Sequence, residues 1–216
     1  MANFGQLKAQ IARDLVRDDL SSDTNASLTD DTISYYVKSV IKKYTDSERL
    51  WFLQEIGTFS TVASTRSYSL STNFSDFVDD KSAKITDTNY DYKLEKRNYD
   101  FMETNYPDTY FTGRPDFYAL QGDNIVLGPV PDQAYTITLT YFKELPELSA
   151  DSDTNDWTTT CERLIRFKTI ADIFTLVLQT PELAAPYEML AREELITIRG
   201  LNNRRSGGGK LKVRYI

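Results

Sequence analysis

The stretch that decides the fold runs from Asp156 to Ile216 and reads DWTTTCERLIRFKTIADIFTLVLQTPELAAPYEMLAREELITIRGLNNRRSGGGKLKVRYI. Its first part carries apolar residues at helical spacing and stops before Pro181, which predicts a core helix with a wide apolar face. A second amphipathic helix is predicted with Pro186 in its first turn, where the missing N–H of proline does no harm. Gly200 and the run 207–209 then predict a loosened chain. The expected core positions of the two helices are Leu164, Phe167, Ile170, Ala171, Phe174, Val177 and Leu178, followed by Tyr187, Leu190, Ala191, Leu195 and Ile198.

Two more helices are predicted at the other end of the chain. Apolar residues recur every three or four positions over 4–15, as in an amphipathic helix of about four turns. A second helix begins after Thr29, whose hydroxyl suits an N-cap, and Asp30 and Asp31 favour the positive end of the helix dipole. Its apolar face continues to about Ser47.

The middle of the chain has the texture of short strands. Alternation over 68–70 and 90–94 indicates strands, and 99–106 indicates a short helical turn that ends before a proline. Residues 117–121 and 125–127 flank a Gly-Asp-Asn turn and predict a hairpin, and 134–143 alternates as a half-buried strand, so we expect a meander of at least three strands. The fold class is therefore α+β: an α-helical body of about four helices with an inserted antiparallel β-sheet region. The expected parts are N-terminal helices over 1–49, the β insertion over 50–148, C-terminal helices over 149–205 and a flexible docking tail over 206–216. A polar linker is expected over 145–160, across the boundary between the β insertion and the C-terminal helices.

Charge is distributed unevenly along the chain. From Arg199 onward there are six basic residues and no acidic residue. Removing these six from the 25 basic residues leaves 19 against 32 acidic residues, a net charge of −13 for the rest of the chain. An acidic body repels nucleic acid, whereas a short basic arm suits an acidic partner surface. The asymmetry indicates protein docking and not sequence-specific DNA binding.

Composition excludes several classes of catalytic site. The chain has no histidine, so histidine-dependent triads are excluded, and its single cysteine, Cys161, permits neither an intrachain disulfide nor a cysteine-based metal cluster. Adjacent acids are read as solvated loop or helix residues, because acid–base catalysis needs two carboxyl groups held in a cleft with separated pKa values. We expect no enzyme, no cofactor and no metal site. The apolar run 170–178 is too short to span a bilayer, and the first ten residues lack a secretory signal, so assembly in a cytosol is expected. The adjacent acids are Asp18-Asp19, Asp30-Asp31, Asp79-Asp80 and Glu193-Glu194.

Partner recognition is expected near the C-terminus. Residues 211–216 alternate apolar and basic side chains, as a strand added to a partner's sheet would. Trp157 is either an interface anchor or a plug over the start of the following helix. The tyrosine-rich middle of the chain is interpreted as core and interface packing. The candidate partner-binding residues are Trp157, Arg199, Arg204, Arg205, Lys210, Lys212, Arg214, Tyr215 and Ile216.

Three stretches of the chain resemble the head-to-tail adaptor, or connector, proteins of tailed bacteriophages. The segments GRPDFYAL (113–120), NIVLGPVP (124–131) and YTITLTYF (135–142) are similar to the sheet of that family, although Gly128 stands where another residue is expected. Residues 148–157 resemble the family's "T-N-W" lead into a helix, with Asp156 as an insertion or a substitution, and 192–205 resembles its closing basic helix.

The resemblance implies a structural virion protein of the head-tail neck. It implies a dodecameric ring that binds the portal on one side and tail, nozzle or fibre proteins on the other, around the channel through which genomic DNA leaves without sequence-specific binding. Two alternatives stay open: a carbohydrate-binding or fibre-type β module, and a carboxylate-based hydrolase.

Overall fold

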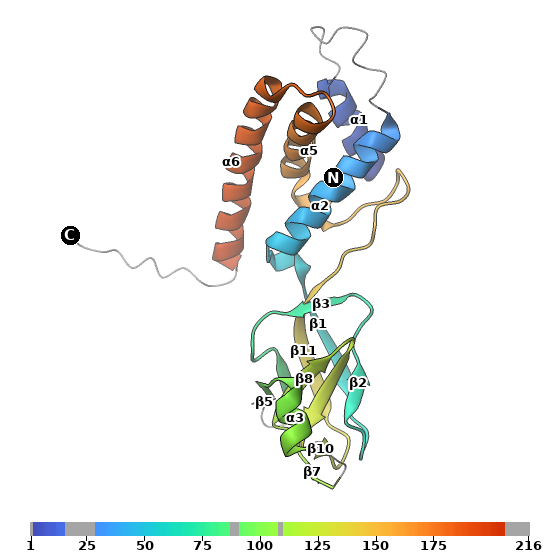
Figure 1. Ribbon diagram of the computed structural model, residues 1–216, viewed down its shortest axis with the longest axis vertical. Helices are drawn as coiled ribbons and strands as arrows, with labels where there is room; N and C mark the ends of the chain where they lie inside the picture. Colours follow the sequence, from blue (N-terminus) through green and yellow to red (C-terminus); the bar gives the residue numbers. More distant parts are fainter. Residues whose placement is uncertain (1, 16–28, 87–90, 108–109, 206–216) are drawn as a thin grey trace, which may run out of the picture. The chain divides into compact units, whose positions relative to one another are not determined.

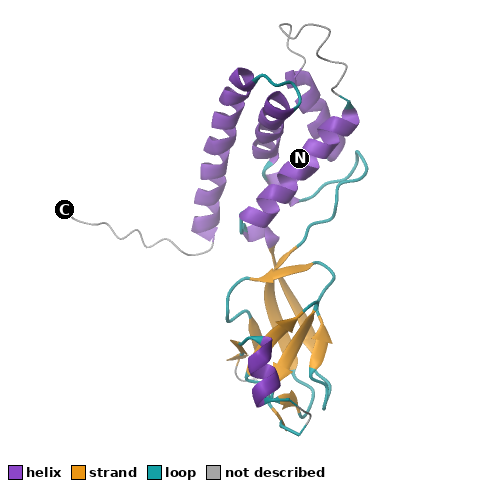
Figure 2. Cartoon of the chain, in the orientation of Figure 1, coloured by secondary structure: helices purple, strands orange, loops and turns teal. Residues whose placement is uncertain are grey.

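The computed structural model describes residues 2–15, 29–86, 91–107 and 110–205. It confirms the α+β class: most helices come from the two ends of the chain, and the strands come from its middle, together with a short helix (Figure 2). The chain forms two compact units. The helical unit comprises Met1–Leu53 and Leu145–Ile216, and the β unit comprises Gln54–Glu144.

The helical unit is built around α5 (Glu162–Leu176), which packs against α6 (Pro181–Arg205) on one side and α1 (Phe4–Leu15) and α2 (Asp30–Ser47) on the other (Figure 1). The core helix predicted after Trp157 is thus central. Its residues Leu164, Ile165, Ile170, Ile173 and Phe174 are at most 1% exposed. Short turns at Trp51–Leu53 (η2) and Asp156–Thr160 (α4) complete the unit.

The start of α2 follows its sequence signals, as predicted. The Thr29 hydroxyl accepts a hydrogen bond from the Thr32 backbone N–H at 3.2 Å. Asp30 and Asp31 occupy the first turn, where a negative charge is favourable. The helix ends at Ser47, and Glu48 closes it with a backbone bond to Tyr44.

The boundaries of α6 and α4 differ from the prediction. α6 begins at Pro181, not near Pro186, because a proline at the first helical position loses no hydrogen bond. Pro186 lies inside the helix, which also continues through Gly200 to Arg205. Residues 156–160, expected to be linker, form α4 because Asn155 and Thr158 make a reciprocal capping box.

The described residues of the β unit form three sheets. A five-stranded sheet has the order β1-β11-β4-β5, with β3 also paired to β11, and a four-stranded sheet has the order β2-β9-β8-β6. A short parallel pair joins β10 to β7. The strand bounds are Gln54–Ser60 (β1), Ser67–Ser69 (β2), Phe74–Phe77 (β3), Ala83–Thr86 (β4), Asp91–Lys93 (β5), Glu95–Lys96 (β6), Thr112–Gly113 (β7), Phe117–Gln121 (β8), Asn124–Gly128 (β9), Val130–Pro131 (β10) and Thr136–Lys143 (β11).

The predicted hairpin is confirmed, but the predicted meander is wrong. β8 and β9 pair in register from Phe117↔Gly128 to Gln121↔Asn124, and Gly122 takes a positive φ of 57° in the turn. β11 does not extend this hairpin; it pairs with β1, β3 and β4 in the other sheet. Pro129 and Pro131 interrupt the ladder between the two, because proline cannot donate to a neighbouring strand. The helical turn predicted over 99–106 is α3 (Tyr99–Asn105).

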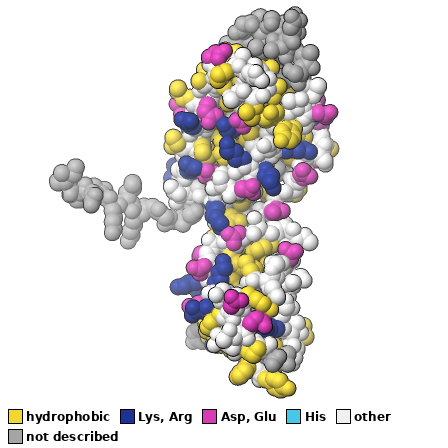
Figure 3. Space-filling model, in the orientation of Figure 1, with side chains coloured by type: hydrophobic (Ala, Val, Ile, Leu, Met, Phe, Trp, Pro, Cys, Tyr) yellow, Lys and Arg dark blue, Asp and Glu magenta, His cyan; other side chains and the backbone are white. Residues whose placement is uncertain are grey.

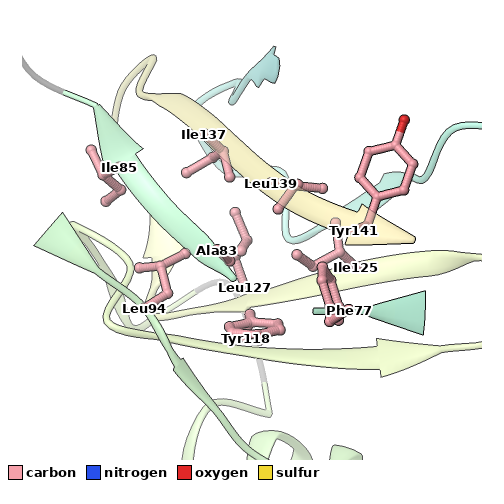
Figure 4. Close-up of a cluster of buried hydrophobic side chains, with 10 residues drawn as sticks. All are labelled: Phe77, Ala83, Ile85, Leu94, Tyr118, Ile125, Leu127, Ile137, Leu139 and Tyr141. Atoms are coloured by element: carbon pink, nitrogen blue, oxygen red, sulfur yellow. The ribbon is translucent and has the colours of Figure 1, made fainter. Parts of the chain in front are cut away.

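The two larger sheets share one apolar core. Side chains from both meet in it, including Ile85, Ile137 and Leu139 from one sheet and Tyr118 and Leu127 from the other (Figure 4). Phe77 and Tyr118 pack edge to face with ring centroids 5.0 Å apart. The alternation of the predicted strands therefore marks residues that point into this core.

Candidate partner-binding surface

Trp157 lies in the core of the helical unit. Its side chain is 0% exposed, and its indole N–H donates a 2.7 Å hydrogen bond to the Thr45 hydroxyl. Its ring packs edge to face on Phe52 at 5.1 Å and contacts Tyr44. Trp157 is therefore inaccessible to a partner, which corrects its inclusion among the partner-binding residues. Trp157 instead fits the other interpretation, in which its side chain covers the start of the following helix.

Arg199 is held by an intramolecular ion pair. Its guanidinium binds both carboxylate oxygens of Glu48, with Nε 2.9 Å from Oε2. The Glu48 side chain is only 11% exposed, whereas that of Arg199 is 55% exposed. The hydrogen bonds to Glu48 raise the pKa of Arg199 above its ordinary value. The pair fastens the last turns of α6 to the end of α2.

The two arginines after it differ in their contacts. Arg205 lies over the ring of Trp51, with its guanidinium carbon 4.6 Å from the ring centroid. Asn202 accepts a hydrogen bond from the Trp51 backbone N–H at 2.9 Å, so this segment also packs on α6. Arg204 is exposed, and among the described residues it makes no ion pair. Of the three predicted arginines, Arg204 is thus the most available to a partner.

The rest of the predicted docking site lies outside the described residues. It consists of Lys210, Lys212, Arg214, Tyr215 and Ile216.

Metal-binding groups and the single cysteine were candidates for chemistry in this chain. The described part of the chain contains no group of three or more His, Cys, Asp or Glu side chains placed to hold a metal. Burial, assisted by Asp156 and Glu194, raises the pKa of Cys161 to about 12, so its thiol stays protonated near neutral pH.

In each pair of adjacent acids that the structure describes, one acid makes a structural contact. Asp30 pairs with Lys8 at 2.6 Å, and Glu194 pairs with Arg163 at 3.0 Å. Asp79 accepts a hydrogen bond from the Lys81 backbone N–H in a turn. The pair 18–19 lies outside the described residues.

A comparison with family models decides the identity of the chain. The model described as SU10 adaptor protein matches residues 2–213. The chain belongs to this family. SU10 adaptor proteins are phage head-to-tail adaptors, and the resemblance seen in the sequence is thereby confirmed. Among curated proteins, no sequence matches the chain.

A structural adaptor of the SU10 family joins other proteins of the virion, so exposed apolar surface is of interest. On α6, Met189 is 63% exposed and Ile196 68% exposed. Leu190, expected in the core, is 37% exposed, whereas Ala191 and Ile198 are buried as predicted. Sequence reasoning missed this surface because α6 carries apolar residues on two sides and only one was assigned. Figure 3 shows apolar side chains between charged ones on the face of the helical unit turned to the viewer.

No described helix of this adaptor combines the length and apolar character that crossing a membrane requires.

Proposed function

We propose that this adaptor assembles as a dodecameric ring between the portal and the tail or nozzle, around the channel that DNA uses to leave the head. The single observation that carries the proposal is the family match over residues 2–213. Charge is consistent with it: the chain has a net charge of −7 at pH 7, and a protein bordering a DNA path benefits from repelling the phosphate backbone.

Within the ring, the helical unit forms the body and the β unit meets tail or fibre proteins. This division is supported by the separate core of each unit, since a unit with its own core can present its surface to a different partner. The ring is a virion component of the head-tail neck, assembled in the host cytoplasm. It acts by binding and not by catalysis.

The basic C-terminal segment binds the portal. Arg204 is exposed at the end of α6, and residues 206–216 add three further basic residues with no acidic one. A cationic segment of this kind favours an acidic partner surface. Its alternating apolar and basic side chains would add affinity if the segment pairs as a strand with the edge of a partner's sheet.

Deletion of residues 206–216 tests the docking step. We expect the truncated chain to fold as the full chain does but to fail to sediment with purified portal rings. A matched control keeps all eleven residues and permutes 211–216 so that the charge remains but the alternation is lost. Equal binding by the permuted chain would assign docking to charge alone, and unimpaired binding by the truncated chain would refute the docking role.

The carbohydrate-binding alternative rests on exposed aromatics of the β unit. Tyr110 is 89% exposed and Phe111 57% exposed. Exposed aromatic rings can stack on sugars as well as on protein partners. Retention of the isolated chain on a glycan array, abolished by Tyr110→Ala, would favour that function over the adaptor ring.

A further inference from the structure

β1 is an edge strand of the five-stranded sheet in the β unit. It pairs with β11 along one side, and no described strand lies along its other side. β1 has seven residues, whereas the strands at the other sheet ends, β5, β2 and β6, have two or three each. A long uncovered edge is a ready template for a further strand.

The ladder with β11 shows which backbone groups of β1 are unpaired. The Thr61 N–H donates to the Tyr135 carbonyl at 2.9 Å, just beyond the end of β1. Hydrogen-bonded pairs alternate along an antiparallel ladder, so the odd-numbered residues of β1 direct their backbone groups toward β11. Consistent with this, the N–H of Thr140, which lies opposite Ile56, donates to Ser82 on the other side of β11. The N–H and C=O groups of the even-numbered residues point away from β11, and no backbone hydrogen bond to another described strand satisfies them.

β1 lacks the features that usually protect an edge strand. Protected edges are short or bulged, or carry lysine or proline, but β1 reads QEIGTFS and pairs with β11 without a register shift. Its one charged side chain, Glu55, is engaged within its own sheet: it accepts hydrogen bonds from the Tyr141 hydroxyl at 3.1 Å and the Asn73 amide at 3.3 Å. Glu55 Oε2 also lies 3.6 Å from Lys143 Nζ. Ile56, in contrast, is 68% exposed.

The free edge of β1 is complementary to the same edge of a second copy. A two-fold axis at Gly57 makes the two strands antiparallel, with Ile56 opposite Thr58 of the second copy and Gln54 opposite Ser60. Every even-numbered residue then faces an even-numbered one, so the outward-pointing N–H and C=O groups of the two edges meet. All seven residues of each strand are paired, which allows up to about eight backbone hydrogen bonds.

Side chains favour this register over its neighbours. On the exposed face, each Ile56 lies beside Thr58 of the second copy, and the two Ile56 side chains meet diagonally across the axis. On the other face, Glu55 lies opposite Phe59 of the second copy, so no like charges face each other. Moving the axis to Ile56 would bring the two Glu55 side chains into diagonal contact and would pair fewer residues.

We propose that two copies of the chain pair through β1, antiparallel about a two-fold axis at Gly57, so that their five-stranded sheets join into one. The contact is isologous and therefore closes at two copies. It does not rest on the proposed ring, in which neighbouring copies meet through a heterologous contact. The dimer is a form of the free chain before assembly.

Opposite charges at one position test the two-fold contact. Ile56→Lys and Ile56→Glu each bring two like charges together across the axis. Each variant of the full chain is expected to dimerise about tenfold or more weakly than the natural chain, which is about 1.4 kcal/mol, as measured by sedimentation equilibrium. An equimolar mixture of the two variants is expected to recover the dimer, because the introduced charges are then opposite.

Cysteine cross-linking tests the register. Ile56→Cys mixed with Thr58→Cys should form a disulfide-linked dimer, because directly opposed residues of a hydrogen-bonded pair have Cα atoms about 5.5 Å apart. Each variant alone should link less, since its cysteines meet only across the diagonal. The natural Cys161 is 2% exposed and should not contribute. Linking of the mixture no faster than of either variant alone would overturn the register and with it the proposal.

Controls separate the contact from folding and from general surface charge. Tyr35→Lys, on α2 and 66% exposed, should dimerise like the natural chain, and circular dichroism should be unchanged for all variants. If Ile56→Lys does not fold, Thr58→Lys places the same charge at the position opposite it and replaces it in the test. The proposal is overturned if the natural chain stays monomeric, if the lysine variant dimerises as the natural chain does, or if the mixture of charge variants does not recover the dimer.

Discussion

The hydrogen bond between Trp157 and Thr45 gives a quantitative test of how the helical unit is held together. Trp157→Phe removes the indole N–H and part of the ring from a site that is 0% exposed. Thr45→Val instead keeps the ring and removes its 2.7 Å acceptor. Both changes should lower the free energy of unfolding, for different physical reasons.

The expected magnitudes follow from burial and pairing. Thr45→Val leaves a buried donor unpaired, which costs about 1–3 kcal/mol. Trp157→Phe loses the bond and some packing, about 2 kcal/mol, against about 3–5 kcal/mol for complete truncation to alanine. With both changes made, no unpaired donor remains, so the double variant should be about 1 kcal/mol more stable than the sum of the single effects predicts.

Urea unfolding followed by tryptophan fluorescence measures these effects. Both tryptophans of the chain, Trp51 and Trp157, lie in the helical unit, so Trp51 still reports on that unit when Trp157 is replaced. Thr175→Val, at an exposed position of α5, is the matched control and should change stability by less than about 0.5 kcal/mol. If both single variants match this control and show no coupling, the bond does not stabilise the unit.

Three further changes test other contacts. Tyr118→Phe removes a buried hydroxyl that has no hydrogen-bond partner among the described residues, so by near-ultraviolet circular dichroism the β unit should be as stable or about 1 kcal/mol more stable at pH 7. Burial, with nearby aspartates, raises the pKa of Tyr118 above the ordinary 10.0, so stability present below pH 10 should fall as the pH rises further, and less so in the variant. Gly128→Ala would put its Cβ 2.7 Å from Met102 Cε and 2.9 Å from Tyr106 Cδ2, and should destabilise the β unit by about 1–3 kcal/mol in urea unfolding. Gly200→Ala, whose Cβ would meet no described atom within 4 Å, should stabilise α6 by about 1 kcal/mol in the same experiment. Burial lowers the pKa of Lys8, but hydrogen bonds to Asp151 and Asp30 outweigh burial, so the pKa of Lys8 is raised above its ordinary 10.5. The charged Lys8 therefore stabilises the fold below pH 10.5, and this stabilisation is lost as the pH rises further. Lys8→Met should be less stable than the natural chain at neutral pH, and the difference should disappear in alkaline titrations above pH 10.5.

Local signals in the sequence predicted the helices and strands better than they predicted which of these elements pair or pack together. Thr29 and the aspartates after it specify the start of α2 through contacts within one turn, and the Gly122 turn specifies a hairpin in the same way. The pairing of β1 with β11 joins residues far apart in the chain, from Gln54↔Phe142 onward, and alternation alone does not select a partner strand. The course of α6 through Gly200 was missed because local propensity favours an end there, while contacts of Arg199 and Asn202 hold the helix.

For the predicted partner-binding residues, the sequence shows the charge but not which side chains are available to a partner. The concentration of basic residues at the end of the chain is visible in the sequence. That Arg199 is committed to Glu48, and Trp157 to Thr45, depends on neighbours more than a hundred positions away. Contacts between residues so far apart cannot be seen in the sequence. Only the fold tells which basic or aromatic side chains are held by structural contacts and which are available to a partner.

The pairing of β1 with β11 has a consequence for the order of folding during synthesis. The β unit is inserted between the two segments of the helical unit, so α5 and α6 leave the ribosome after it is complete. Gln54 and Phe142 face each other in adjacent strands, about 5 Å apart at their Cα atoms, so folding of the insertion brings its two ends together. The entropic cost of closing this long loop is then met before α5 emerges from the ribosome. α1 and α2 can therefore pack against α5 as though the three helices were close together in the sequence.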